Sequence, residues 1–164
     1  MVAEEISDKL QNVKVSFPNW LVGVDLLVSR GEKRIGIQVN VSGYIDRKDL
    51  GREHIGCSFQ QIGKERLDKS RGKVDFHVFL TRWPVHGKNE EHPFKYKFPI
   101  VPSSELEKRL TVKPALKGLY YLCFHFDENG KNVWDEGVWA PPTDPLTDYS
   151  QFLDAWELLN KALQ

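Results

Sequence analysis

A strict alternation of side chains over residues 35–42 constrains the fold of this chain more than any other feature. From Ile35 to Val41 every second residue is β-branched, and the residues between are small or polar. Because successive side chains of a strand point to opposite faces, the pattern predicts a strand with one apolar and one polar face. The stretch 21–30 is nearly all apolar and ends at Gly31, which predicts a buried strand and a tight turn before the alternating one.

Amphipathic helices are predicted at both ends of the chain, over Val2–Gln11 and Tyr149–Leu163, because apolar residues recur there at helical spacing. Strands predominate between them. Further strands are predicted over 13–17, 74–82, 98–101, 118–127 and 132–140, helices over 59–70 and 103–110, and a polar loop over 43–58. This order favours an α/β fold with a mixed central sheet flanked by helices.

The composition is that of one globular domain spanning residues 1–164. Hydrophobic residues make up 40% of the chain and charged residues 28%, which suits a single core of ordinary size. Lys plus Arg and Asp plus Glu each number 23, so no net charge draws the whole molecule to nucleic acid or lipid. The sequence has no P-loop, GxGxxG or GxSxG motif, which argues against nucleotide hydrolases, dinucleotide oxidoreductases and serine hydrolases.

The sequence predicts a cytoplasmic protein without a membrane span. No stretch approaches the roughly 18 apolar residues that a spanning helix needs, and the first residues are acidic where a signal peptide is basic and then apolar. The two cysteines, Cys57 and Cys123, form no CxxC pair and fit a reducing compartment. Cys123 shares a strand face with His125, and both are interpreted as packing residues rather than as a nucleophile or a metal site. Trp134 is a candidate for stacking on nucleotide bases, with core packing as the alternative.

A local cluster of cations lies between residues 47 and 73. Its members are Arg47, Lys48, Arg52, Lys64, Arg66, Lys69, Arg71 and Lys73. Because phosphate contacts depend on a few clustered cations rather than on total charge, this cluster is a candidate surface for nucleic acid. The alternative is a solvated helix face and loop.

One carboxylate, Asp25, interrupts the apolar stretch 21–30. A charge in a buried strand needs a partner or a purpose. On the next strand Gln38 and Asn40 are two residues apart and therefore share a face, and pairing of the two strands as a hairpin would bring Asp25 near that face. The alternative is that Asp25 pairs with a nearby arginine and that both amides lie on a solvated or helix-covered face.

The stretch VGVDLLVSRGEKRIGIQVNVS resembles the PD-(D/E)xK nuclease superfamily, in which an Asp on one strand is followed, after a turn, by (E/D/Q)xK on the next. Asp25 matches the family Asp, Gln38 takes the acidic or Gln position, and Asn40 stands where the family has Lys. The resemblance implies a restriction-endonuclease-like fold, nucleic acid as partner, and Mg²⁺ held by Asp25 and Gln38. It also implies that the opening helix lends an acidic residue, Glu5.

In such a site Mg²⁺ takes oxygen ligands, clamps the scissile phosphate and lowers the pKa of an attacking water. The family lysine orients that water, and Asn40 has neither its charge nor its titratable proton. Lys33 and Lys48 are the neighbouring lysines that could replace it. Two functions therefore remain open: a metal-dependent nuclease with Asp25, Gln38 and Asn40 at its catalytic centre, and a catalytically inactive interaction domain that binds protein or nucleic acid.

Overall fold

The computed structural model describes residues 1–19, 21, 23–46, 56–84, 94–127, 129–135 and 144–164. The helices in this part of the chain are α1 (Val2–Lys9), α2 (Lys64–Ser70), α3 (Ser103–Leu110) and α4 (Trp156–Ala162), with a 3-10 helix at Ser150–Phe152. The strands are β1 (Lys14–Ser16), β2 (Leu26–Arg30), β3 (Lys33–Val41), β4 (Gly43–Asp46), β5 (Gly56–Gly63), β6 (Phe76–Pro84), β7 (Phe94–Lys97), β8 (Ile100–Pro102), β9 (Leu119–Phe126) and β10 (Val133–Asp135). The predicted α/β class with a mixed sheet is confirmed.

The larger sheet has the strand order β1-β2-β3-β6-β7, and β8 also pairs with β6. The first three strands form an antiparallel meander, which confirms the predicted hairpin of β2 and β3. β3 and β6 pair in parallel, so the chain must cross over between them, and α2 lies in that connection. The strand predicted over 21–30 begins only at Leu26, because Gly23 turns the chain with a φ of +85°.

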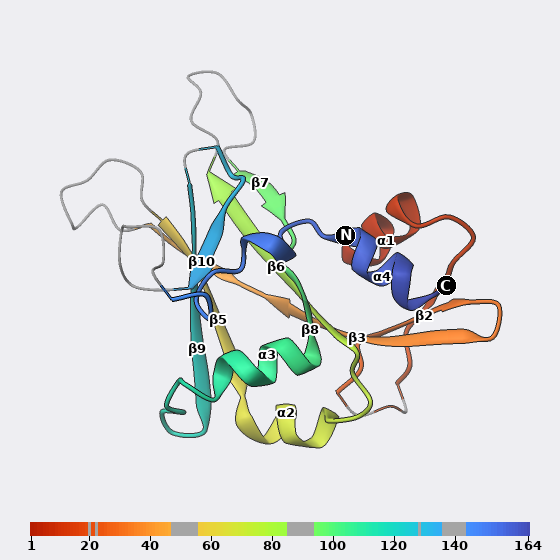
Figure 1. Cartoon of the computed structure of the whole chain (residues 1–164), viewed down its shortest axis with the longest axis horizontal. Coiled ribbons are helices and arrows are strands. Elements are labelled where there is room, and N and C mark those ends of the chain that lie inside the picture. The colour runs from red at the N-terminus through yellow and green to blue at the C-terminus, as the bar shows by residue number, and fades with distance from the viewer. Residues whose placement is uncertain (20, 22, 47–55, 85–93, 128, 136–143) are drawn as a thin grey trace.

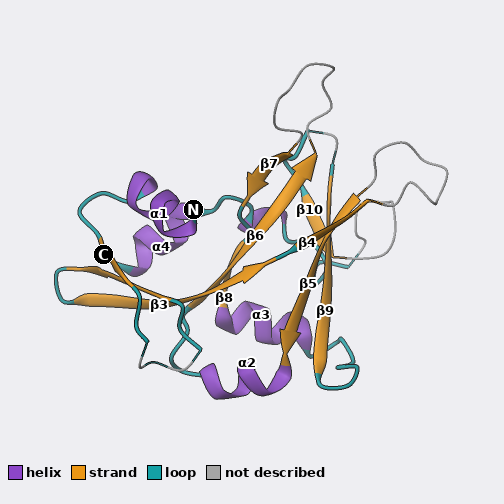
Figure 2. Cartoon of the chain, turned by 180° about the vertical axis from the view of Figure 1, so that it is seen from behind, coloured by secondary structure: helices purple, strands orange, loops and turns teal. Residues whose placement is uncertain are grey.

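The two terminal helices cover one face of this sheet. Figures 1 and 2 both show α1 and α4 on one side of β2 and β3, with α2 and α3 on the other. Ile6 of α1 and Leu159 of α4 are fully buried in one cluster with Val28, Ile37 and Val78. Removing each such side chain from water stabilises the fold by about 1.5–3 kcal/mol. Apolar packing therefore closes this face, and the polar residues of β3 lie on the other one.

The smaller sheet is antiparallel, with the order β10-β9-β5-β4, and it packs with α3 around a second core. Two predictions for this part of the chain were wrong. The loop expected over 43–58 contains β4 and the start of β5, and the helix expected over 59–70 begins only at Lys64. The reason is a period of two: Ser58, Gln60 and Ile62 are buried and alternate with more exposed neighbours, as in a strand.

No helix in the described ranges is long and apolar enough to cross a membrane.

Candidate functional site

A buried polar face on β3 and β6 is the first part of the site. Ile37 and Val39 belong to the core beneath the terminal helices, so Gln38 and Asn40 point the other way, with exposures of 1% and 8%. His77, also 1% exposed, lies beside Gln38 in the parallel register of β3 and β6. Three polar side chains thus share one buried face of the mixed sheet.

Asp25 joins this face immediately before β2 begins. Its backbone N–H donates to the carbonyl oxygen of Ile37 at 2.9 Å, and its carboxylate Oδ2 accepts a hydrogen bond from the N–H of Val39 at 2.8 Å. The prediction that the hairpin brings Asp25 to the strand of Gln38 and Asn40 is therefore confirmed.

Arg66 of α2 is the partner of the Asp25 side chain. Its Nη2 lies 3.0 Å from both carboxylate oxygens. The side chains of Arg66 and Asp25 are 50% and 38% exposed, so the pair lies at the surface, where such a contact contributes about 0–1 kcal/mol. The structure thus confirms the alternative interpretation of Asp25 as a carboxylate that pairs with a nearby arginine.

Two glycines allow the end of α2 to approach the strands. A Cβ on Gly23 would lie 2.5 Å from Cβ of Ser70, and a Cβ on Gly36 would lie 2.3 Å from the carbonyl oxygen of Lys73. The N–H of Gly36 also donates to Oδ2 of Asp75 at 2.7 Å. This close approach docks the segment that follows α2 against β3 and sets the position from which Arg66 reaches Asp25.

The buried polar layer contains atoms without partners. In the described residues, Gln38 Oε1, Asn40 Nδ2 and His77 Nδ1 are enclosed and make no hydrogen bond. Each such atom costs roughly 1–3 kcal/mol of stability. Polar groups that are retained although they lower the stability of the fold are typical of functional sites.

Burial, and to a lesser extent the positive charge of Arg66, lowers the pKa of His77 to about 4. His77 is therefore neutral at pH 7.

We expect Gln38→Met to stabilise the protein by about 1 kcal/mol, because it removes a buried acceptor without a partner and nearly preserves the side-chain volume. Gln61→Met on the exposed side of β5 is the matched control and should change stability by less than about 0.5 kcal/mol. Urea denaturation measures both. A loss of stability in Gln38→Met would show that the Gln38 amide is satisfied in the folded protein.

The residues brought together here do not fit Mg²⁺. Within the described residues, no group of three or more His, Cys, Asp or Glu side chains is placed to hold a metal. Mg²⁺ requires octahedral oxygen coordination. Asp25, the predicted carboxylate ligand, already carries the guanidinium of Arg66. Glu5 does not join it, since α1 packs on the sheet face that carries Ile37, whereas Gln38 points to the opposite face.

Of the two lysines considered as substitutes for Asn40, Lys33 does not reach it. Lys33 is exposed at the turn that begins β3, and Asn40 lies seven residue steps further along the strand, roughly 23 Å away. Lys48 lies outside the described residues.

The cation cluster is largely charge-compensated where the structure describes it. Lys64 pairs with Asp68, Lys69 with Glu65, and Arg71 with Glu107 and Asp68, at N–O distances of 2.6–3.6 Å. Arg47, Lys48 and Arg52 lie outside the described residues. The α2 part of the cluster is thus a solvated helix face with paired charges. Arg66 differs from its neighbours because it pairs with Asp25, whose carboxylate accepts a hydrogen bond from β3.

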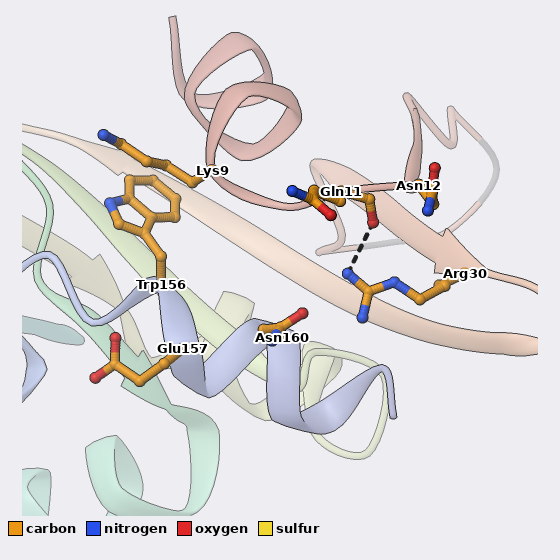
Figure 3. Close-up of a pocket in the computed structure, with 7 residues that line it drawn as sticks. All are labelled: Lys9, Gln11, Asn12, Arg30, Trp156, Glu157 and Asn160. Atoms are coloured by element: carbon orange, nitrogen blue, oxygen red, sulfur yellow. Dashed lines mark hydrogen bonds between the residues drawn. The ribbon is translucent and has the colours of Figure 1, made fainter.

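A hollow of about 540 Å³ lies between the terminal helices and the end of β2 (Figure 3). It is lined by Lys9, Gln11, Asn12, Arg30, Trp156, Glu157 and Asn160. Nη2 of Arg30 donates to the carbonyl oxygen of Gln11 at 2.9 Å. None of the predicted site residues lines this hollow, which lies on the side of the sheet away from Gln38.

The remaining candidates are structural. Cys123 is disulfide-bonded, so the interpretation of this cysteine as a packing residue was wrong. Trp134 is buried and its ring lies 6.4 Å from that of His125, which confirms core packing over base stacking.

Comparisons with protein-family models, curated proteins and solved structures found no match for this chain. The site is therefore defined by its geometry. The sequence pattern predicts Asp25, Gln38 and Asn40 as site residues, but it does not predict the roles of Arg66 and His77. The order of the elements carried a signal for Arg66. A helix that connects two parallel strands lies across one face of the sheet, and α1 already covers the other face.

Proposed function

We propose that this chain is a divergent restriction-endonuclease-like domain of the PD-(D/E)xK type that binds nucleic acid without cleaving it. The element order supports the fold: an opening helix, an antiparallel hairpin, and a helical crossover to a parallel strand. The positions of Asp25 before β2, and of Gln38 and Asn40 on the adjacent face of β3, support the same assignment, as does the motif resemblance.

The contact of Arg66 with Asp25 is the observation that supports binding without cleavage. A metal at this corner would need the carboxylate oxygens that Arg66 and Val39 already use. Asn40 brings no charge to orient a water molecule, and His77 is buried. The corner thus neutralises the carboxylate of Asp25 with the protein's own cation, and among the described residues it presents no group that would activate water.

The test combines binding, cleavage and metal titration. We expect labelled single-stranded and duplex DNA and RNA to bind equally well in EDTA and in Mg²⁺ or Mn²⁺, with no cleavage on gels. Calorimetry should show no metal binding to the wild type or to Asp25→Ala. Metal-dependent cleavage that disappears in Asp25→Ala would instead establish a nuclease. Absence of binding to every nucleic acid would reject the proposal and favour a protein-binding domain.

A further inference from the structure

We infer that Arg66 is a built-in cation that takes the position of a metal at this corner and binds a phosphate group of the nucleic acid. This inference rests on the proposed function and names the side chain that recognises the ligand. It predicts phosphate binding that is independent of divalent metal.

The carboxylate of Asp25 holds the side chain of Arg66 in position. The N–H of Val39 fixes the carboxylate of Asp25, and that carboxylate holds Nη2 of Arg66 through both of its oxygens. The contact therefore ties a long and flexible side chain of α2 to the sheet. A guanidinium held in one orientation loses less rotamer freedom when it binds a second group.

Two nitrogen atoms of the Arg66 guanidinium group are not used by the contact with Asp25. Within the described part of the chain, Nη2 is the only Arg66 nitrogen with a hydrogen-bond partner, and half of the side chain is exposed. Nε and Nη1 are therefore donors available to a ligand. A planar array of N–H donors matches the oxygens of a phosphate, and such charge-assisted hydrogen bonds are stronger than neutral ones.

The neighbouring buried face carries neutral polar side chains. Asn40 Nδ2 is a donor without an acceptor in the described residues, and His77 is neutral at pH 7. These groups add no negative charge to that of Asp25. A phosphate at Arg66 therefore meets one neutralised carboxylate rather than the acidic cluster that a metal site requires.

The other described cations of α2 lack this arrangement. Lys69 pairs with Glu65 of its own helix, and both side chains are largely exposed, so the contact holds Lys69 in no fixed orientation. Lys69→Ala therefore removes one positive charge from the same helix without touching Asp25. It is the matched control for Arg66→Ala.

The experiment measures fluorescence anisotropy of labelled single-stranded DNA, duplex DNA and RNA at several salt concentrations, in EDTA and in Mg²⁺. We expect Arg66→Ala to weaken binding about tenfold or more and to reduce the salt slope by about 1, because a charge-assisted phosphate contact is lost. Arg66→Lys keeps the charge but not the planar donors and should restore binding only in part. Lys69→Ala should weaken binding less than about threefold. Circular dichroism checks that each variant folds.

A second measurement separates this inference from the proposed function. Inorganic phosphate is titrated while the Arg66 Nε–H signal is followed by NMR, with Arg66→Ala used to assign the signal. A saturable shift, together with the tenfold loss above, supports the inference. A shift without nucleic-acid binding by the wild type would reject the proposed function and keep the phosphate site. Equal losses in Arg66→Ala and Lys69→Ala, a requirement for Mg²⁺, or no phosphate shift would overturn the inference.

Discussion

Replacing Gly36 with alanine is expected to destabilise the fold by about 3 kcal/mol and to move α2 away from β3. The new Cβ would lie 2.3 Å from the carbonyl oxygen of Lys73, which belongs to the backbone and cannot rotate away as a side chain can. The segment after α2 must therefore shift, and the N–H of Gly36 would lose its hydrogen bond to Asp75. Urea denaturation measures the change in the free energy of unfolding.

Gly63→Ala is the control for this substitution. Its Cβ would lie 3.7 Å from Cβ of Arg66, an ordinary contact, and the φ of −66° at Gly63 suits alanine. We expect its stability to change by less than about 1 kcal/mol. If Gly36→Ala is as stable as this control, the segment after α2 is not docked on β3. The positioning of Arg66 would then need another explanation.

Lowering the pH from 7 to 4 is expected to cost the fold about 3 kcal/mol through His77 alone. The unfolded imidazole has its ordinary pKa of 6.5, whereas the pKa in the folded protein is lowered to about 4 by burial and by Arg66. The unfolded chain therefore takes up the proton first as the pH falls. The contribution of neutral His77 is complete above about pH 6.5 and is lost progressively down to about pH 4.

The measurement is the free energy of unfolding between pH 4 and pH 7 for the wild type and His77→Gln. Glutamine does not titrate, so the variant should lose the part of the pH dependence that lies above about pH 5, while the carboxylates contribute equally to both proteins. Parallel curves would mean that His77 keeps an ordinary pKa in the folded protein and that its environment is more polar than its burial indicates.

Local patterns predicted most of the elements because they carry their own periodicity. The alternation that ends at Val41 predicted β3, and the hairpin followed from the turn at Gly31. The junction between β5 and α2 was misassigned because Phe59 and Ile62 fit a helical stripe as well as a strand. Short apolar runs often allow both interpretations, and only pairing with a neighbouring strand decides between them.

The partner of Asp25 could not be predicted because it depends on tertiary structure. Arg66 is 41 residues away and reaches Asp25 only after α2 has docked over the sheet. The division into two sheets is also nonlocal. The Oγ atoms of Ser42 and Ser58 lie 2.6 Å apart and join the end of β3 to β5, and no local motif predicts such a contact. The placement of Glu5 likewise depends on which face of the sheet α1 covers.

If mutations were to convert this corner into a metal-dependent site, the pairing of Arg66 with Asp25 would make the order of those mutations important. With Arg66 in place, Asn40→Lys would bring a second cation to a single carboxylate. Loss of Arg66 alone would leave that carboxylate without a counter-charge. Each change is unfavourable alone and is relieved by the other, so the two positions are epistatic. Selection would have to change them together or pass through a weakened intermediate.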